Sequence, residues 1–200
     1  MTRGRDIPRR LGTSDWRRRV VRAALAKLSH PDQAERMKPA RLTPGFGQES
    51  VWDYPRPPRV ELEPRLVRVV LGGEEIARSQ GSLRVLETSH PPVYYLPPGD
   101  IEAGALSVSG AGSWCEWKGM ASYLDVSGGD RRERRAAWLY DTPAKGYSDL
   151  AGFVAFYAPL MDQCYVGDEL VVPQPGGFYG GWVTSWVVGP FKGIPGSTYW

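Results

Sequence analysis

Short runs of β-branched and aromatic residues, each ended by glycine or proline, follow one another through most of this sequence. The 200 residues include 24 glycines and 18 prolines, and few stretches have the spacing of a long apolar helix. Gly72-Gly73 and Gly167-Asp168 have the form of two-residue hairpin turns. This spacing predicts a mainly β fold, a small sandwich or barrel-like body in place of a helical bundle.

The runs define the strands that we expect, and the segments between them define the turns. A short helical turn is expected after Pro97-Pro98-Gly99-Asp100, and a loop is expected over 142–152. The expected strands are residues 65–71, 74–79, 82–87, 93–96, 106–109, 114–118, 121–126, 133–140, 152–157, 163–166, 169–172 and 182–188.

Charge divides the chain into a basic arm and an acidic body. Residues 1–41 carry twelve Lys/Arg and four Asp/Glu, a difference of +8, whereas the remainder carries 13 and 18, a difference of −5. We expect a basic N-terminal arm over 1–48, helical over about 15–28, followed by a single β domain over 49–200. Clustered Lys and Arg can contact nucleic acid phosphates, but we favour a solvated arm or one that docks on the acidic body.

The sequence shows neither a membrane segment nor a secretory signal. No apolar run approaches the roughly 18 residues that a membrane span requires, and no charged-then-apolar leader opens the chain. Cys115 and Cys164 are the only cysteines, and neither belongs to a Cys-x-x-Cys pair. We therefore expect a reduced, cytoplasmic protein, with one disulfide between the two cysteines left open.

A titratable cluster at the end of one expected strand is the first candidate for a site. Glu87, Thr88, Ser89 and His90 end the strand, and Pro91-Pro92 follow directly. A histidine has the intrinsic pKa for proton transfer near neutral pH, and Glu87 can orient it if the turn folds back. The alternatives are that His90 bonds backbone groups in a turn and that Glu87 pairs with Lys118.

Cys115 and Lys118 form a second candidate. Cys115 lies between two tryptophans and is a candidate nucleophile, although a cysteine in such a strand also serves as a small core residue. On a continuous strand Cys115 and Lys118 face opposite sides, so they share a site only if Gly119 begins a bend. Three aromatic residues can supply stacking faces for a base or sugar ring: Tyr123, Trp138 and Tyr140.

Four stretches of the body resemble one known family. They are LRVLETSHPPVYYLPPGDI, WCEWKGMASYLDV, AAWLYDTP and GFVAFYAPLMDQCYV, in that order. Together they resemble the bacterial domain of unknown function 427 family, which carries a nucleotidyltransferase-type label, over about residues 65–168. The segments VWDYPRPPRV and FYGGWVTSWVVGPFKGIPGSTYW resemble flanking segments seen in members of that family.

The resemblance implies a compact domain of two packed antiparallel sheets, similar to the β-tent group. Zinc-binding members of that wider group use paired Cys-x-x-Cys motifs, which this chain lacks, so no metal is carried over. The chain also lacks a P-loop and the Gly-Ser plus Asp-x-Asp pattern of nucleotidyltransferases. Neither a cofactor nor an enzymatic reaction is specified by the sequence.

Two functions remain open. In the first, the domain binds a small polar or nucleotide-like ligand in a groove around Glu87, His90 and Lys118, with transfer or hydrolytic chemistry as a further option that would use His90, Glu87 and Cys115. In the second, it is a non-catalytic interaction module, including self-association, that uses its aromatic flanks. The aromatic residues of the C-terminal flank are Phe178, Tyr179, Trp182, Trp186, Tyr199 and Trp200.

Overall fold

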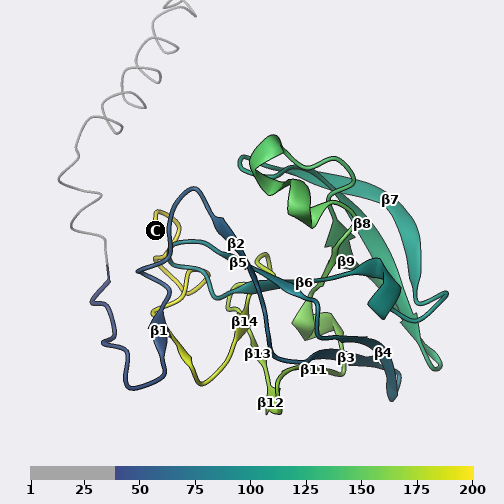
Figure 1. Ribbon diagram of the computed structural model, residues 1–200, viewed down its shortest axis with the longest axis horizontal. Coiled ribbons are helices and arrows are strands. Elements are labelled where there is room, and N and C mark those ends of the chain that lie inside the picture. The colour runs from purple at the N-terminus through teal and green to yellow at the C-terminus, as the bar shows by residue number, and fades with distance from the viewer. Residues whose placement is uncertain (1–38) are drawn as a thin grey trace, which may run out of the picture. The chain divides into compact units, whose positions relative to one another are not determined.

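The computed structural model describes residues 39–200 of the protein, and residues 1–38 of the expected basic arm, with the predicted helix, lie outside them (Figure 1). Three short 3₁₀ helices connect the strands: η1 (Pro98–Asp100), η2 (Lys145–Leu150) and η3 (Ala158–Leu160). Within the described residues, no helix has the length and apolar character to cross a membrane.

The strands are short except for three long neighbours near the middle of the chain. In chain order they are β1 (Glu49–Ser50), β2 (Arg59–Leu62), β3 (Val67–Leu71), β4 (Glu74–Ser79), β5 (Leu83–Leu86), β6 (Val93–Leu96), β7 (Leu106–Cys115), β8 (Gly119–Gly128), β9 (Arg131–Leu139), β10 (Val154–Phe156), β11 (Gln163–Val166), β12 (Glu169–Leu170), β13 (Val172–Pro173), β14 (Trp182–Val183) and β15 (Val187–Val188).

Two antiparallel sheets make up most of the domain, which confirms the predicted mainly β class. The large sheet has the order β2-β5-β6-β10-β9-β8-β7, and the small sheet has the order β12-β11-β3-β4. Two further pairs complete the structure, β1 with β15 in parallel and β13 with β14 antiparallel. The long β7–β8 hairpin curves away at one end of the large sheet (Figure 1).

The main core lies between the two sheets. Successive side chains of a strand point to opposite faces, so Val67, Val69 and Leu71 of β3 all turn inward and are fully buried. Tyr94 and Phe156 meet them from the large sheet, as part of the same buried cluster. The apolar residues of the small sheet therefore cover one face of the large sheet.

The opposite face of the large sheet carries a second buried cluster. Tyr95, Trp138 and Ala155 alternate with the core-facing residues of β6, β9 and β10. Tyr147 and Leu150 of η2 pack on the same cluster. Because the sheet has packed side chains on both faces, its central strands β6 and β10 consist of aliphatic and aromatic residues alone.

Several strand boundaries differ from the expected ones. The expected strands 106–109 and 114–118 are one strand, β7, because a bulge at Gly110 (φ 71°) is absorbed within the hairpin pairing. Conversely, the expected strand 182–188 is two short strands, β14 and β15, each with a different partner. Residues 116–118 form the hairpin turn and are not part of a strand.

Trp182 fixes the C-terminal segment, residues 174–192, to the body of the domain. Its side chain is 1% exposed and its ring centroid lies 5.2 Å from that of Tyr94. The backbone N–H of Trp182 donates to the Pro92 carbonyl at 2.9 Å, and the indole Nε1 donates to the Phe156 carbonyl at 3.1 Å. Packing and hydrogen bonds thus hold one indole against two strands of the large sheet.

We predict that Trp182→Ala lowers the free energy of unfolding by about 3–5 kcal/mol, because it leaves a large cavity in the main core. Urea denaturation measures this change. Trp114, which is 72% exposed on β7, provides the matched control, and Trp114→Ala is expected to change stability by no more than about 0.5 kcal/mol. Equal losses in the two variants would contradict the anchoring role of Trp182.

Candidate functional site

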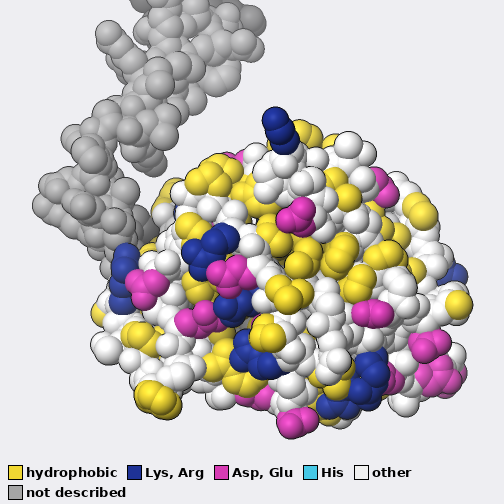
Figure 2. Space-filling model, in the orientation of Figure 1, with side chains coloured by type: hydrophobic (Ala, Val, Ile, Leu, Met, Phe, Trp, Pro, Cys, Tyr) yellow, Lys and Arg dark blue, Asp and Glu magenta, His cyan; other side chains and the backbone are white. Residues whose placement is uncertain are grey.

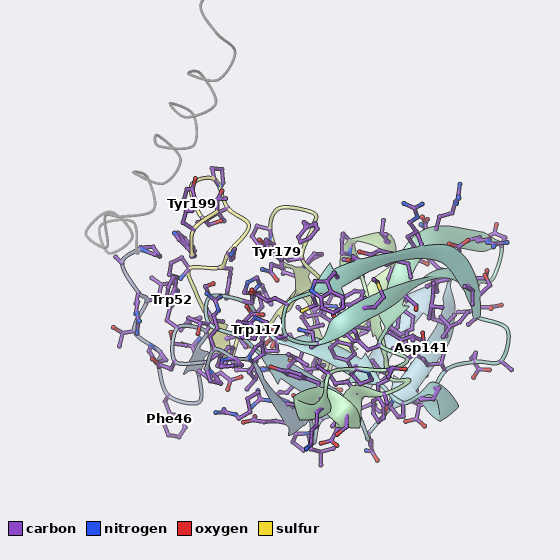
Figure 3. The ribbon with its side chains drawn as sticks, turned by 90° about the horizontal axis from the view of Figure 1, so that it is seen from above. Phe46, Trp52, Trp117, Asp141, Tyr179 and Tyr199 are labelled. Atoms are coloured by element: carbon purple, nitrogen blue, oxygen red, sulfur yellow. The ribbon has the colours of Figure 1, made fainter. Side chains whose placement is uncertain are left out.

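A cavity of about 450 Å³ lies over the second face of the large sheet and brings all seven candidate residues of the sequence analysis to its walls. Its floor comes from β6 to β9 and the β7–β8 turn, and its cover comes from the C-terminal segment. Figure 3 labels Trp117 on the floor side and Tyr179 on the cover. The seven candidates are Glu87, His90, Cys115, Lys118, Tyr123, Trp138 and Tyr140.

Strand alternation explains why the floor residues meet. Ser113 and Cys115 are two apart on β7, and Ala121 and Tyr123 are two apart on β8. The pairs Ser113↔Ala121 and Tyr123↔Trp138 are in register across the sheet. Residues of one parity on adjacent strands share a face, so the polar and aromatic side chains of four strands converge.

Lys118 and Cys115 reach the same cavity because the chain turns between them. Gly119 has φ 95°, in the left-handed region that favours glycine, and the bend that the sequence left conditional is present. Lys118 is 8% exposed, with its Nζ 5.9 Å from the Tyr140 ring centroid and 6.0 Å from that of Tyr147. Among residues 39–200, no carboxylate pairs with this ammonium group and no group accepts a hydrogen bond from it.

A strained turn places His90 at the cavity wall. Ser89 is fully buried and has φ 71°, which is uncommon for a residue with a side chain. Its N–H donates to the Val51 carbonyl at 3.0 Å, and its carbonyl accepts from the Lys192 N–H at 2.8 Å. The turn is therefore clamped by two segments far away in the sequence, in the way that strained functional backbone is commonly stabilised.

His90 has a pKa of about 3, which differs from the near-neutral value expected from the sequence. Burial disfavours the charged imidazolium, and the nearby positive charges of Lys192, Arg56 and Lys118 lower the pKa further. The Tyr179 ring closes one side, with its centroid 4.8 Å from that of the imidazole. His90 is consequently neutral at physiological pH.

Glu87 does not orient the imidazole through its carboxylate. The carboxylate pairs with Arg56 at 3.3 Å, whereas the backbone carbonyl of Glu87 accepts a hydrogen bond from the backbone N–H of His90 at 2.9 Å. The sequence suggested a hydrogen bond between the Glu87 carboxylate and His90, or an ion pair between Glu87 and Lys118. Neither contact occurs within the described residues. The negative charge of Glu87 is thereby largely neutralised at the rim.

Hydroxyl and thiol groups line the floor. Trp138 Nε1 donates to the Tyr95 hydroxyl at 3.2 Å, and the Tyr123 hydroxyl donates to Ser113 Oγ at 3.0 Å. Burial, together with the neighbouring Tyr95 and Cys115, raises the pKa of Tyr140. The Tyr140 hydroxyl therefore stays neutral and can act as a hydrogen-bond donor.

The two cysteines are free thiols in different parts of the domain. Cys115 lines the cavity, whereas Cys164 is buried in β11 within the main core. The disulfide left open by the sequence is not formed in this structure. Burial raises the pKa of Cys164. Because Cys164 lies in the core and Cys115 lines the cavity, only Cys115 has a position from which it can meet a ligand.

Sequence reasoning missed the residues of the cover. Gln174, Tyr179 and Lys192 all line the cavity, although they lie more than 80 residues after His90. A Cβ at Gly180 would lie 2.1 Å from Trp138 Cη2, so close packing requires glycine at this position. That contact is a tertiary one, and nothing local in the sequence indicates it.

Positive charge at the cavity is a local feature. Lys192 lies at the wall, where burial and then Arg56 lower its pKa, and its Nζ donates to the Trp200 backbone oxygen at 2.8 Å. On the face shown in Figure 2, by contrast, acidic and basic side chains are interspersed. Within residues 39–200, no group of three or more His, Cys, Asp or Glu side chains is arranged to hold a metal ion.

The fold and the cavity define a β domain with a cavity of about 450 Å³ on the outer face of its large sheet. Residues 59–167 match the family model described as a domain of unknown function (DUF427), and the chain belongs to that family. A comparison with curated proteins gives no match. The matched region includes the floor of the cavity and His90, and it ends before Gln174, Tyr179 and Lys192.

We predict that Gly180→Ala destabilises the domain by about 1–3 kcal/mol, because the added methyl group overlaps the Trp138 ring. Urea denaturation measures the loss. Gly146 offers a matched control, since a Cβ there meets no atom within 4 Å. If the two alanine variants have the same stability, the cover does not pack on Trp138 as described.

A second prediction concerns acid stability. The folded pKa of His90 is about 3, below the unfolded value near 6.5, so between these values the unfolded chain binds a proton that the folded chain does not. The contribution of neutral His90 to the free energy of unfolding is thus fully present above pH 6.5. Between pH 6.5 and pH 3 it falls by roughly 1.4 kcal/mol for each pH unit. Urea denaturation at pH 7, 6 and 5 should show a shallower decline in His90→Gln, and parallel curves would contradict the assignment.

Proposed function

We propose that the cavity binds a small ligand that carries an anionic group and a planar ring, nucleotide-like in character. The observation that carries this proposal is the Lys118 ammonium group, which is 8% exposed at the cavity wall and has no counter-ion within residues 39–200. Isolated buried charges are costly, and proteins normally pair them. A phosphate or carboxylate of the ligand would supply the missing partner.

The remaining walls suit a ring. Trp138 and Tyr157 lie with ring centroids 4.4 Å apart on the floor, and Tyr179 closes the cover. Trp114 and Phe178 also border the cavity and are 72% and 74% exposed. Aromatic side chains of this kind give stacking and edge contacts to planar ligands.

Binding is better supported than catalysis. A histidine with a pKa of about 3 is a weak general base at neutral pH, and the Glu87 carboxylate pairs with Arg56. The transfer or hydrolytic chemistry considered from His90, Glu87 and Cys115 therefore stays a prediction.

The accessible thiol of Cys115 fits a reducing compartment such as the cytoplasm.

The interaction-module alternative has less support from the described residues. Trp182 belongs to the main core, Tyr179 covers the cavity, and the Arg65 guanidinium lies 4.2 Å from the Trp186 ring centroid. Much of the aromatic C-terminal flank is thus used inside the domain. Self-association and contact of the basic arm with nucleic acid stay predictions.

We expect a panel of nucleoside monophosphates and sugar phosphates, tested with and without magnesium, to contain a ligand that stabilises the protein. At about one hundred times its dissociation constant, such a ligand adds roughly 2.7 kcal/mol, which raises Tm by roughly 5–10 °C for a chain of this size. Lys118→Met should weaken its binding about 10- to 100-fold, because one charge-assisted contact is lost. Thermal shift and titration calorimetry measure both effects.

Lys145 provides the control, because it is exposed in η2 and does not line the cavity. Lys145→Met should bind the same ligand with unchanged affinity. A panel without any stabilising compound, or a ligand that Lys118→Met binds as tightly as the original chain does, would count against the proposal.

A further inference from the structure

The side-chain amide of Gln174 is held in one orientation. Gln174 is 4% exposed and follows β13 at the start of the cover. Its Oε1 accepts the Gly181 N–H at 3.1 Å, and its Nε2 donates to the Lys192 carbonyl at 2.9 Å. Exchanging the two ends of the amide would set oxygen against a carbonyl and NH₂ against an N–H, so the hydrogen bonds assign the orientation.

The same NH₂ group faces His90. Gln174 Nε2 lies 3.1 Å from His90 Nδ1. An amide NH₂ can only donate, so Nδ1 must be the acceptor and must carry no proton. A neutral imidazole with an unprotonated Nδ1 carries its proton on Nε2.

We infer that Gln174 is a positioning residue that holds His90 as a neutral imidazole whose Nε2–H donates to the ligand of the cavity. No group among residues 39–200 makes a hydrogen bond with Nε2, and His90 lines the cavity. Together with the Lys118 ammonium group, this donor specifies a ligand group that is rich in acceptor oxygens, a phosphate or a carboxylate. The donor role depends on the proposed function, whereas the position of the proton does not.

The charges around His90 favour this state over a wide pH range. The titratable or charged groups near the imidazole come from four segments of the chain, and the positive ones disfavour a second proton on the ring. His90 should therefore donate through Nε2 from pH 5 to pH 8, and it should not serve as a proton acceptor. These groups are Arg56, Glu87, Lys118, Tyr179 and Lys192.

Nuclear magnetic resonance tests this inference without a ligand. In the ¹⁵N-labelled full chain, His30→Asn leaves His90 as the single imidazole, and long-range ¹H–¹⁵N correlation spectra report which nitrogen is protonated. We expect the Nε2–H form alone from pH 8 to pH 5. A spectrum of the Nδ1–H form, an averaged mixture, or titration near pH 6.5 would overturn the inference.

Gln174→Glu should reverse the pattern. A carboxylate at this position accepts a hydrogen bond, so the proton should move to Nδ1 and the pKa of His90 should rise above about 5. Gln163→Glu makes the same change at an exposed position of β11 and should leave the His90 spectrum unaltered. An unaltered His90 spectrum in Gln174→Glu would remove the positioning role.

Gln174→Met gives a second variant of similar volume that lacks the donor. It should show a mixture of the two neutral forms of His90, and persistence of Nε2–H alone would also overturn the role of Gln174. Failure of the compound panel with the Nε2–H form intact would refute the proposed ligand and not the positioning. Where a panel compound binds but leaves the His90 Nε2–H resonance unchanged, the donor role alone would be refuted.

Discussion

Burial of the Trp182 indole is the interaction on which the site depends. The ring lies in the main core against Tyr94 and donates its Nε1–H to the Phe156 carbonyl, and the backbone N–H of Trp182 donates to the Pro92 carbonyl. The chain that leads into this anchor covers the floor with Gly180 and Tyr179, and Trp182 itself pairs with Pro173 of β13. A residue of the hydrophobic core therefore decides where polar groups such as Gln174 meet His90.

The neutral histidine and the lone lysine are two results of the same electrostatics. Lys118 is 8% exposed, and charges at such a position interact more strongly than they do in water. That charge, with Lys192 and Arg56, opposes protonation of His90. The cavity thus keeps its imidazole uncharged and carries its positive charge on the ammonium groups of Lys118 and Lys192.

The mainly β class and most strand positions could be predicted from the sequence because strand alternation and glycine turns are local signals, whereas the order of strands in the sheets could not. Those signals also indicated the floor residues Cys115, Tyr123 and Trp138, but the meeting of Cys115 with Lys118 depended on the backbone at Gly119. The cover could not be predicted, since Gln174 lies 84 residues from His90 and is placed by the burial of Trp182. The low pKa of His90 has the same origin, because burial and distant charges set it.

The floor of the cavity lies within the region that matches the family, and the cover lies outside it. The matched region ends at residue 167, so it supplies the sheet, Lys118 and His90, but not the amide that fixes the imidazole. A relative with the same sheet and another C-terminal segment would keep the cation and lose the partner of His90 Nδ1. In such a chain the histidine would be free to take either neutral form, and one scaffold could serve either as an anion receptor or as a host for acid–base chemistry.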